Sequence, residues 1–152
     1  MAHRLLAKRS VPLASNQAEY SLLHRHPEND GVFDACKELG ITLLAYSPLA
    51  MGLLSGKFTP SSPPPGERGR RYDADYIATI QPLIGLMKEV GQSHHGKTPV
   101  QVTLNWVICK GAIPIHGAKN NAQAEENAGA LGWRLTVDEV HALNTASKEL
   151  QR

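Results

Sequence analysis

Polar residues stand at the ends of three apolar, strand-like runs of the sequence, where a ligand is most readily held. The three ends read Ser15-Asn-Gln17, Tyr46-Ser-Pro-Leu49 and His116-Gly-Ala-Lys119. In parallel α/β folds, ligands bind beyond the carboxyl ends of the strands, where such side chains converge. The sequence therefore predicts one binding site that is assembled from these three segments.

The segment from His116 to Asn121 is the most informative of the three. The apolar run is followed by Gly117, a small residue, Lys119 and then Asn121 at the expected N-cap of a helix. Backbone N–H groups at a helix N-terminus bind phosphate, and the charge of Lys119 would add to that attraction. A plain turn between a strand and a helix, with a solvated lysine, explains the same residues equally well. Both interpretations stay open on these residues alone.

The strands that position these groups alternate with helices along the chain. Short apolar runs that suit buried parallel strands occupy residues 11–17, 41–46 and 112–116. Helical spacing and capping signals predict helices over residues 29–39, 81–92, 98–111, 121–130 and 136–150. Strands separated by helical crossovers indicate a parallel sheet, either part of a barrel or an open doubly wound sheet.

Two further segments qualify this outline. Residues 1–10 are basic and acid-free like the start of a transit peptide, but they run directly into the first strand and are interpreted as the end of a helix. Residues 59–71 are rich in Pro and Arg and lie within a long connection after the second strand. A loop of that length inside a domain is usually a lid or a binding loop.

Size and composition limit the classes of function. With 152 residues, the chain has the length of one domain, and its 16 basic and 14 acidic residues are too balanced for a nucleic-acid-binding surface. No apolar stretch reaches the roughly 20 residues that a bilayer crossing needs. Cys36 and Cys109 are interpreted as reduced thiols. His24 with His26, and His94 with His95, lack further ligands at metal-binding spacing, so no metal is expected.

Five motifs follow one another in a definite order. They are Asn16-Gln17 with Glu19-Tyr20, Ala45-Tyr-Ser-Pro-Leu49, Leu54-Ser-Gly-Lys57, Ile113-Pro-Ile-His-Gly-Ala-Lys119 and Gln123-Ala-Glu-Glu-Asn127. In this order and spacing they resemble the nicotinamide-cofactor motifs of the aldo-keto reductases, in the plant and potassium-channel-β-like branch. The stretch Asn127-Ala-Gly-Ala-Leu-Gly-Trp133 is similar to that branch as well. The resemblance covers nearly the whole chain.

The resemblance implies a fold and a cofactor. Residues 1–152 would form an α/β unit, the last three βα units and the C-terminal helix of a TIM (β/α)8 barrel, with NADP(H) bound across it. By motif position, Gln17 would hydrogen-bond the nicotinamide carboxamide, and Tyr46 would stack on the nicotinamide ring. Ser47, Leu49 and Lys57 would line the pyrophosphate.

The resemblance also assigns the adenosine end of the cofactor. Gly117 would let the backbone approach the cofactor, and Lys119 would meet the 2′-phosphate that distinguishes NADP(H). Three residues on one helix face would hold the adenine: Gln123, Glu126 and Asn127. The loop at residues 59–71 corresponds to one that folds over the cofactor, without indicating which of its arginines, Arg68, Arg70 or Arg71, would touch phosphate.

Departures from the family pattern shape the functional hypothesis. His116 stands where the family has Pro, and the Asp-Tyr-Lys-His tetrad that reduces carbonyls in the family's first half has no match in this sequence. No catalytic residue is therefore assigned. We expect the cofactor-binding half of an NADPH-dependent oxidoreductase of aldehydes and ketones, inactive alone. The alternative is a non-catalytic half-barrel that binds a nucleotide or a partner chain.

Assembly and location follow from the same hypothesis. The first and last of three parallel strands leave unpaired N–H and C=O groups, so we expect self-association or pairing with a chain that completes the barrel. A small carbonyl compound would be the substrate of the complete enzyme. A cytoplasmic location is expected, or a plastid location if a transit peptide precedes this sequence.

Overall fold

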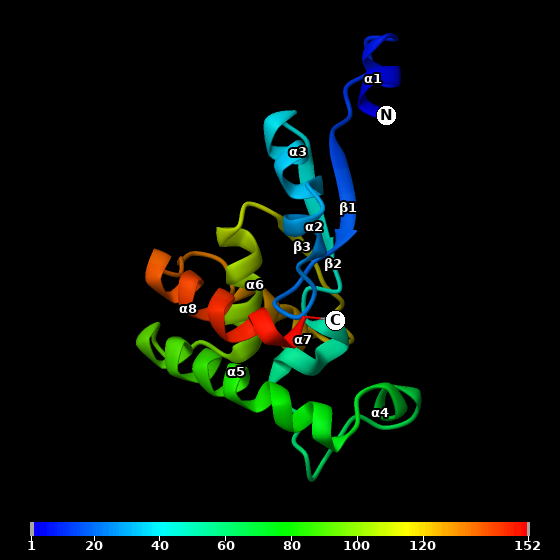
Figure 1. The fold of residues 1–152 in the computed structure, drawn as a ribbon. Helices are drawn as coiled ribbons and strands as arrows, with labels where there is room; N and C mark the ends of the chain where they lie inside the picture. Colours follow the sequence, from blue (N-terminus) through cyan, green and yellow to red (C-terminus); the bar gives the residue numbers. More distant parts are fainter. Residues whose placement is uncertain (1, 152) are drawn as a thin grey trace.

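The computed structural model describes residues 2–151 (Figure 1). Within this range, helices alternate with three short strands. Near the chain's end, the Gln151 side chain accepts the N–H of Arg25 at 2.8 Å and donates to the carbonyl of Leu22 at 2.7 Å. The elements are, in order, α1 (Ala2–Ala7), β1 (Ser15–Glu19), α2 (His26–Asn29), α3 (Val32–Glu38), β2 (Thr42–Tyr46), the 3-10 segment η1 (Ala50–Ser55), α4 (Glu67–Arg71), α5 (Ala74–Ser93), α6 (Pro99–Cys109), β3 (Ile113–Ile115), α7 (Asn121–Ala128), α8 (Val137–Ser147) and η2 (Lys148–Leu150).

The three strands of the described chain form one parallel sheet in the order β1-β2-β3. Leu43 and Ala45 of β2 are buried and face the helices, with α6 in contact with both α5 and β3. The opposite face is open: Tyr46 is 40%, Ile113 53% and Ile115 43% exposed. The sheet is therefore covered on one face only, as in a segment cut from a barrel.

The first strand lies further along the chain than the apolar pattern predicts. β1 starts at Ser15 instead of residue 11, because its pairing with β2 begins where Ser15 lies opposite Thr42. Just before this point, the N–H of Thr42 donates to the carbonyl of Ala14 at 3.0 Å. Asn16 and Gln17 consequently lie inside the strand and not beyond its carboxyl end.

Helix α5 is longer than expected. It begins at Ala74 instead of residue 81, because the Asp73 side chain accepts a hydrogen bond from the N–H of Tyr76 at 2.9 Å and caps the helix there. Buried Ile77 and Ile80 extend its apolar face toward the core. Pro82 therefore lies inside the helix and not in its first turn, where packing of the buried face outweighs the missing N–H.

The other elements follow the predicted pattern closely, with one break. The expected helix over 29–39 begins later, as α3 at Val32, because Gly31 before it has a left-handed φ of 80°. The short helix α2 ends at Asn29 and lies almost wholly before the predicted range. Both predicted capping boxes are formed, at Thr98 with Gln101 and at Thr136 with Glu139. The helix predicted at the start of the chain is confirmed as α1, and Met1 lies outside the described residues.

A half-buried ion cluster ties the end of β1 to α6. The Glu28 carboxylate accepts hydrogen bonds from the Tyr20 hydroxyl and, at 2.7 Å, from Arg25, and the Lys110 Nζ lies 3.2 Å away. Burial alone would raise the pKa of Glu28, but the hydrogen bonds from Arg25 and Tyr20 and the charge of Lys110 outweigh it and lower that pKa. Burial and the neighbouring carboxylate raise the pKa of Tyr20.

The same cluster attaches the C-terminal helix. Arg25 donates to the carbonyl of Asn144 in α8 at 3.1 Å, and Nε1 of Trp106 donates to the Asn144 side chain at 3.0 Å. Tyr20 stacks on Trp106 with ring centroids 5.2 Å apart. Residues distant in sequence are thus held together by charge and aromatic packing at one point of the core.

The lowered pKa of Glu28 predicts that acid weakens the fold. Its stabilising contribution is complete above its ordinary pKa of 4.5 and is lost as the pH falls through the lowered value in the folded chain. Glu28→Gln should therefore lower the free energy of unfolding at pH 7 by about 1.5–3 kcal/mol and flatten the loss of stability between about pH 5 and pH 3. Urea melts at stepped pH measure both effects.

Glu125→Gln is the matched control, because Glu125 is exposed on α7. This variant should keep the stability and the pH slope of the parent chain. A Glu28→Gln chain with the parent's pH slope would contradict the role given to the cluster.

Candidate functional site

The open face of the sheet brings together an amide and an aromatic ring. Gln17 lies opposite Leu44, and Glu19 lies opposite Tyr46. Because side chains alternate between faces along a strand, Gln17 and Tyr46 share the open face on neighbouring strands. Both are exposed there. The structure thus brings together, on the open face of the sheet, the pair that the family resemblance assigns to a nicotinamide.

The turn after β2 is conformationally strained. Ser47, Ala50 and Met51 have φ values of 52°, 47° and 56°, in the left-handed region that non-glycine residues avoid. Hydrogen bonds from the N–H of Ala50 to the carbonyl of Ser47, and from Gly52 to Leu49, hold the turn at 2.8 and 2.9 Å. Strain of this kind is found mainly at functional sites, and this turn contains the predicted residues Ser47 and Leu49.

Positive charge lies beside the strained turn. Lys57 Nζ is 3.4 Å from the point that a Cβ on Gly52 would occupy, and it lies over the Phe58 ring at 4.7 Å. Arg68, from α4, donates to the carbonyl of Met51 at 3.1 Å. The loop at residues 59–71 contains the short helix α4, and Arg68 joins this helix to the turn.

The third predicted segment forms the start of α7. The N-cap is Asn120 and not the predicted Asn121, because the Asn120 side chain accepts the N–H of Gln123 at 3.0 Å. The Gln123 side chain in turn accepts the N–H of Lys119 at 2.8 Å. These two backbone donors are thus satisfied within the segment, and the exposed Lys119 side chain carries the positive charge at this helix end.

The predicted helix face of α7 is only partly exposed. Gln123 is exposed and Glu126 is half-buried, whereas Asn127 is 6% exposed and donates to the carbonyl of Gly117 at 3.3 Å. The side chain of Asn127 therefore fastens the loop after β3 to α7. Gly117 has open space around its α-carbon, so its backbone is accessible from outside.

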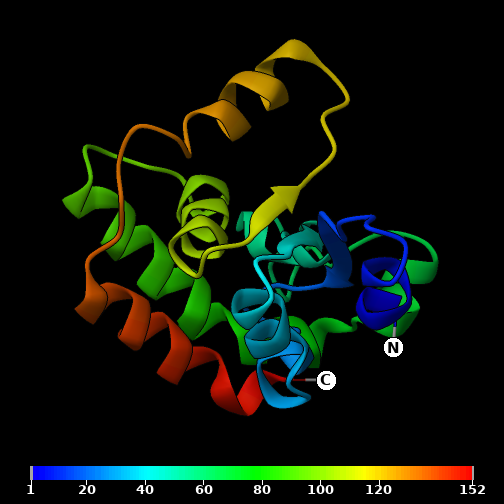
Figure 2. The ribbon, with the colours of Figure 1, turned by 90° about the horizontal axis from the view of Figure 1, so that it is seen from above.

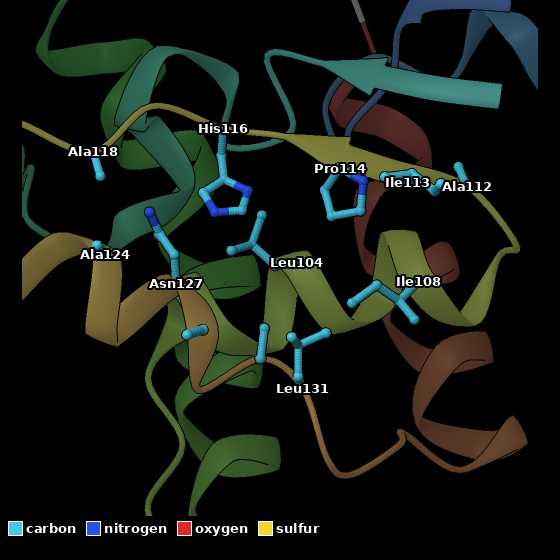
Figure 3. A pocket seen from close by; sticks show the side chains of 12 residues that line it. Leu104, Ile108, Ala112, Ile113, Pro114, His116, Ala118, Ala124, Asn127 and Leu131 are labelled. Atoms are coloured by element: carbon cyan, nitrogen blue, oxygen red, sulfur yellow. The ribbon is translucent and has the colours of Figure 1, made fainter. Parts of the chain in front are cut away.

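A cavity of about 580 Å³ lies between β3, α6 and α7 (Figure 3). Its wall is mostly apolar and includes Leu104, Ile108 and Pro114. The side chains of His116 and Asn127 lie near one another at one end of it, as Figure 3 shows. Among the described residues, His116 Nδ1 is a buried nitrogen without a hydrogen-bond partner. His116 thus adds a polar atom without a hydrogen-bond partner to this cavity.

Sequence reasoning missed a residue that holds the loop after α7. Asn105 of α6 is 0% exposed, and its amide donates to the carbonyls of Ala130 and Trp133, each at 2.9 Å. Its side-chain oxygen accepts the N–H of Leu135 at 3.0 Å. The sequence does place this Asn on the apolar face of a predicted helix. A buried amide requires hydrogen-bond partners, so that position could have indicated a role in holding another segment.

The predicted histidine pairs are accounted for by local contacts. The His24 and His26 rings lie 4.8 Å apart, and His94 pairs with the Glu139 carboxylate at 2.9 Å. Across residues 2–151, no group of three or more His, Cys, Asp or Glu side chains is arranged to hold a metal ion. Nor does any helix in this range have the length and apolar character for crossing a membrane.

A comparison with protein families matches residues 2–148 to the model described as "Aldo/keto reductase family". The chain belongs to the aldo/keto reductase family. The "Pyridoxal reductase, chloroplastic" of Arabidopsis thaliana is 43% identical over 147 residues, which cover 97% of this chain and 40% of that protein. "Aldo-keto reductase yakc [NADP(+)]" of Schizosaccharomyces pombe is 33% identical over 140 residues, 85% of this chain and 41% of that protein.

A solved structure confirms the fold of this aldo/keto reductase chain. A glycerol dehydrogenase of Gluconobacter oxydans superposes with a TM-score of 0.83 at 22% identity, over 96% of this chain and 46% of that one. The predicted partial (β/α) barrel is therefore confirmed. The chain spans 40–41% of the length of its two relatives named above.

Proposed function

We propose that this chain is the NADP(H)-binding part of an aldo-keto reductase that, in its complete form, reduces aldehyde or ketone carbonyls. The observation that carries the proposal is the continuity between two features of the site. The open-face pair Gln17 and Tyr46 leads directly into the strained turn at 47–52, beside which Lys57 and Arg68 lie. An exposed aromatic ring with two cationic side chains beyond it suits a ligand that has a planar ring at one end and a phosphate ester next to that ring.

The nicotinamide end is proposed to lie on the sheet. Tyr46 offers an exposed ring face, and Gln17 offers both an amide donor and an acceptor on the neighbouring strand. The nicotinamide would supply the hydride when bound. The chain's contribution there is orientation, because stacking on Tyr46 fixes the ring plane and the Gln17 amide fixes its rotation.

The phosphate end is proposed to lie at the turn. Ser47 and Leu49 would line the pyrophosphate, with Lys57 supplying charge. Arg68 is the loop arginine best placed for phosphate, because it already joins α4 to the turn through Met51. Arg71 lies over the Tyr72 ring at 5.4 Å.

The adenosine end is proposed to lie at α7. Lys119 would pair with the 2′-phosphate, Gly117 would allow close approach, and Gln123, Glu126 and Asn127 would hold the adenine. The NADP(+) in the name of the fission yeast relative supports this choice of cofactor. Because Asn127 is bound to the Gly117 carbonyl, its part is to hold the loop in place under the cofactor.

The substrate and location are proposed from the plant relative. Pyridoxal reductase is the name of a relative 43% identical to this chain, so an aromatic aldehyde of the pyridoxal type is the proposed substrate of the complete enzyme. The word chloroplastic in that name supports a plastid location over a cytoplasmic one. The side chains on the open face described here include no counterpart of the family's proton-donating tetrad, so we propose that this chain alone is inactive.

Lys119→Ala tests the cofactor assignment. We expect the unmutated chain to bind NADP+ more tightly than NAD+, because an ammonium–phosphate contact contributes about 1.5–3 kcal/mol in favourable cases. Since Lys119 is exposed, the substitution should lower the affinity for NADP+ by about tenfold and leave the affinity for NAD+ almost unchanged. Calorimetric titration measures the four affinities.

Lys37→Ala serves as the control, because Lys37 is exposed on α3, away from the proposed site. It should keep the preference of the parent chain. Equal titration curves for NADP+ and NAD+ with the parent chain would refute the assignment of Lys119.

A second candidate function is a half-barrel that binds a partner chain, and the open sheet favours it. β1 and β3 are edge strands, and Ile113 and Ile115 on β3 are exposed, with Ile113 also lining the apolar cavity. A strand added at the β3 edge would satisfy its unpaired backbone groups and cover apolar surface. The occupant would be a second copy or a chain that completes the barrel.

Light scattering of the purified chain tests this second function. Exposed strand edges predict association, with an average mass above 16.5 kDa that rises with concentration. Ile115→Lys should shift the chain toward the monomer, because a charge on the open face opposes edge pairing. A monomer with a sharp, cooperative melt in the parent chain would remove the basis for partner binding.

A further inference from the structure

The side chain of Gln101 joins two helices through one amide. Its Oε1 accepts the N–H of Thr98 at 3.0 Å and so completes the capping box of α6. Its Nε2 donates to the carbonyl of Glu126, in the last turn of α7, at 3.0 Å. The capping role is local, whereas the second hydrogen bond spans 25 residues of sequence and fixes one helix against the other.

Gly129 leaves the space that this contact requires. It is the C-cap of α7 with φ −64° and ψ −5°, a right-handed conformation that any residue adopts. A Cβ at this position would lie 2.1 Å from Nε2 of Gln101 and 3.0 Å from its Cδ. A side chain at position 129 is therefore opposed mainly by the Gln101 amide, and less closely by the backbone carbonyl oxygen of Glu126, which would lie 3.2 Å from the Cβ. An alanine there would displace the amide from the Glu126 carbonyl.

Helix α7 depends on such polar contacts because it has little apolar packing. Figure 2 shows α7 and the segment before it arching away from the other helices. Within Asn121–Ala128 the buried residue is Asn127, and Ala124 and Ala128 border the cavity. Hydrogen bonds to carbonyls near its end, from Gln101 to Glu126 and from Lys97 to Gly129 at 3.1 Å, therefore set where the helix lies.

We propose that Gln101 is a positioning residue for the adenine side of the cofactor site, and that Gly129 is required so that Gln101 can reach α7. The inference rests on the proposed function, because it assigns to α7 the adenine contacts of Gln123 and Glu126. Gln101 acts on the cofactor through Glu126 and the helix that carries it, without touching the cofactor. Loss of the contact lets α7 move and so weakens adenosine binding.

Gln101→Glu separates the two roles of the amide. A carboxylate still accepts the N–H of Thr98, but it donates no hydrogen bond to the Glu126 carbonyl. In the full chain, we expect amide hydrogen exchange to quicken by about threefold to tenfold over α7, corresponding to one hydrogen bond. Exchange in the first turn of α6 and the melting temperature should stay near those of the parent. Affinity for 2′,5′-ADP should fall by a similar factor.

Gly129→Ala tests the other partner and completes a double-mutant cycle. Alone, it should quicken exchange over α7 as Gln101→Glu does. Combined with Gln101→Ala, it should add little further, because the closest clash, with the amide, is gone and the Glu126 carbonyl oxygen at 3.2 Å needs only a small shift. Gly85→Ala is the matched control, since Gly85 lies in helix α5 with open space around its α-carbon. That control should leave exchange over α7 unchanged.

The outcomes separate this inference from the function on which it rests. Unchanged exchange over α7 in Gln101→Glu, or full additivity of the Gln101→Ala and Gly129→Ala effects, overturns the positioning role. If exchange over α7 quickens as expected but the parent chain fails to bind 2′,5′-ADP, the proposed function is overturned. The adenine contacts assigned to α7 are then overturned as well. Quickened exchange together with weakened 2′,5′-ADP binding supports both.

Discussion

Parallel pairing of three short strands, with helices on one face, is the constraint on which the rest of the structure depends. The alignment of Glu19 with Tyr46, and of Tyr46 with Ile115, turns Leu43 and Ala45 toward the core and Gln17 and Tyr46 toward the open face. Because side chains alternate along a strand, a shift of one residue in β2 would bury the Tyr46 ring and expose Ala45. Burial of the apolar face therefore sets the register, and the register in turn creates the surface proposed for nicotinamide.

The two ends of the proposed cofactor site are held by different kinds of interaction. The sheet end is fixed by apolar packing and by the ion cluster around Glu28, which attaches β1 to α6 and α8. The α7 end is fixed by single hydrogen bonds from Gln101, Lys97 and Asn127 to backbone carbonyls. Such contacts contribute about 0.5–1.5 kcal/mol each, so α7 should open locally before the core does. In the proposed function, α7 would bind the adenosine while the sheet orients the nicotinamide ring.

Local signals in the sequence predicted much of this fold. The capping boxes at Thr98 and Thr136 stand where expected, because a cap depends on neighbours three residues away. The predicted start of β1 was wrong, because pairing with β2 sets that boundary and the apolar content of the segment does not. The contacts of Arg68 with Met51 and of Gln101 with Glu126 join segments distant in sequence, so no local pattern indicates them. The family resemblance supplied the site residues, and the structure adds which of them share a surface.

The central claim, that this chain holds the cofactor without the means to protonate a carbonyl oxygen, is tested most directly by following NADPH absorbance with pyridoxal and the purified chain. A positioned proton donor contributes about 10²–10⁴-fold to such a reaction, and we propose that residues 2–151 carry no counterpart of the family's tetrad. The account predicts NADPH binding, seen as a change in its fluorescence, with no loss of absorbance above the rate without protein. Clear turnover that disappears in Tyr46→Ala would contradict it, because the chain would then assemble a working active site of its own.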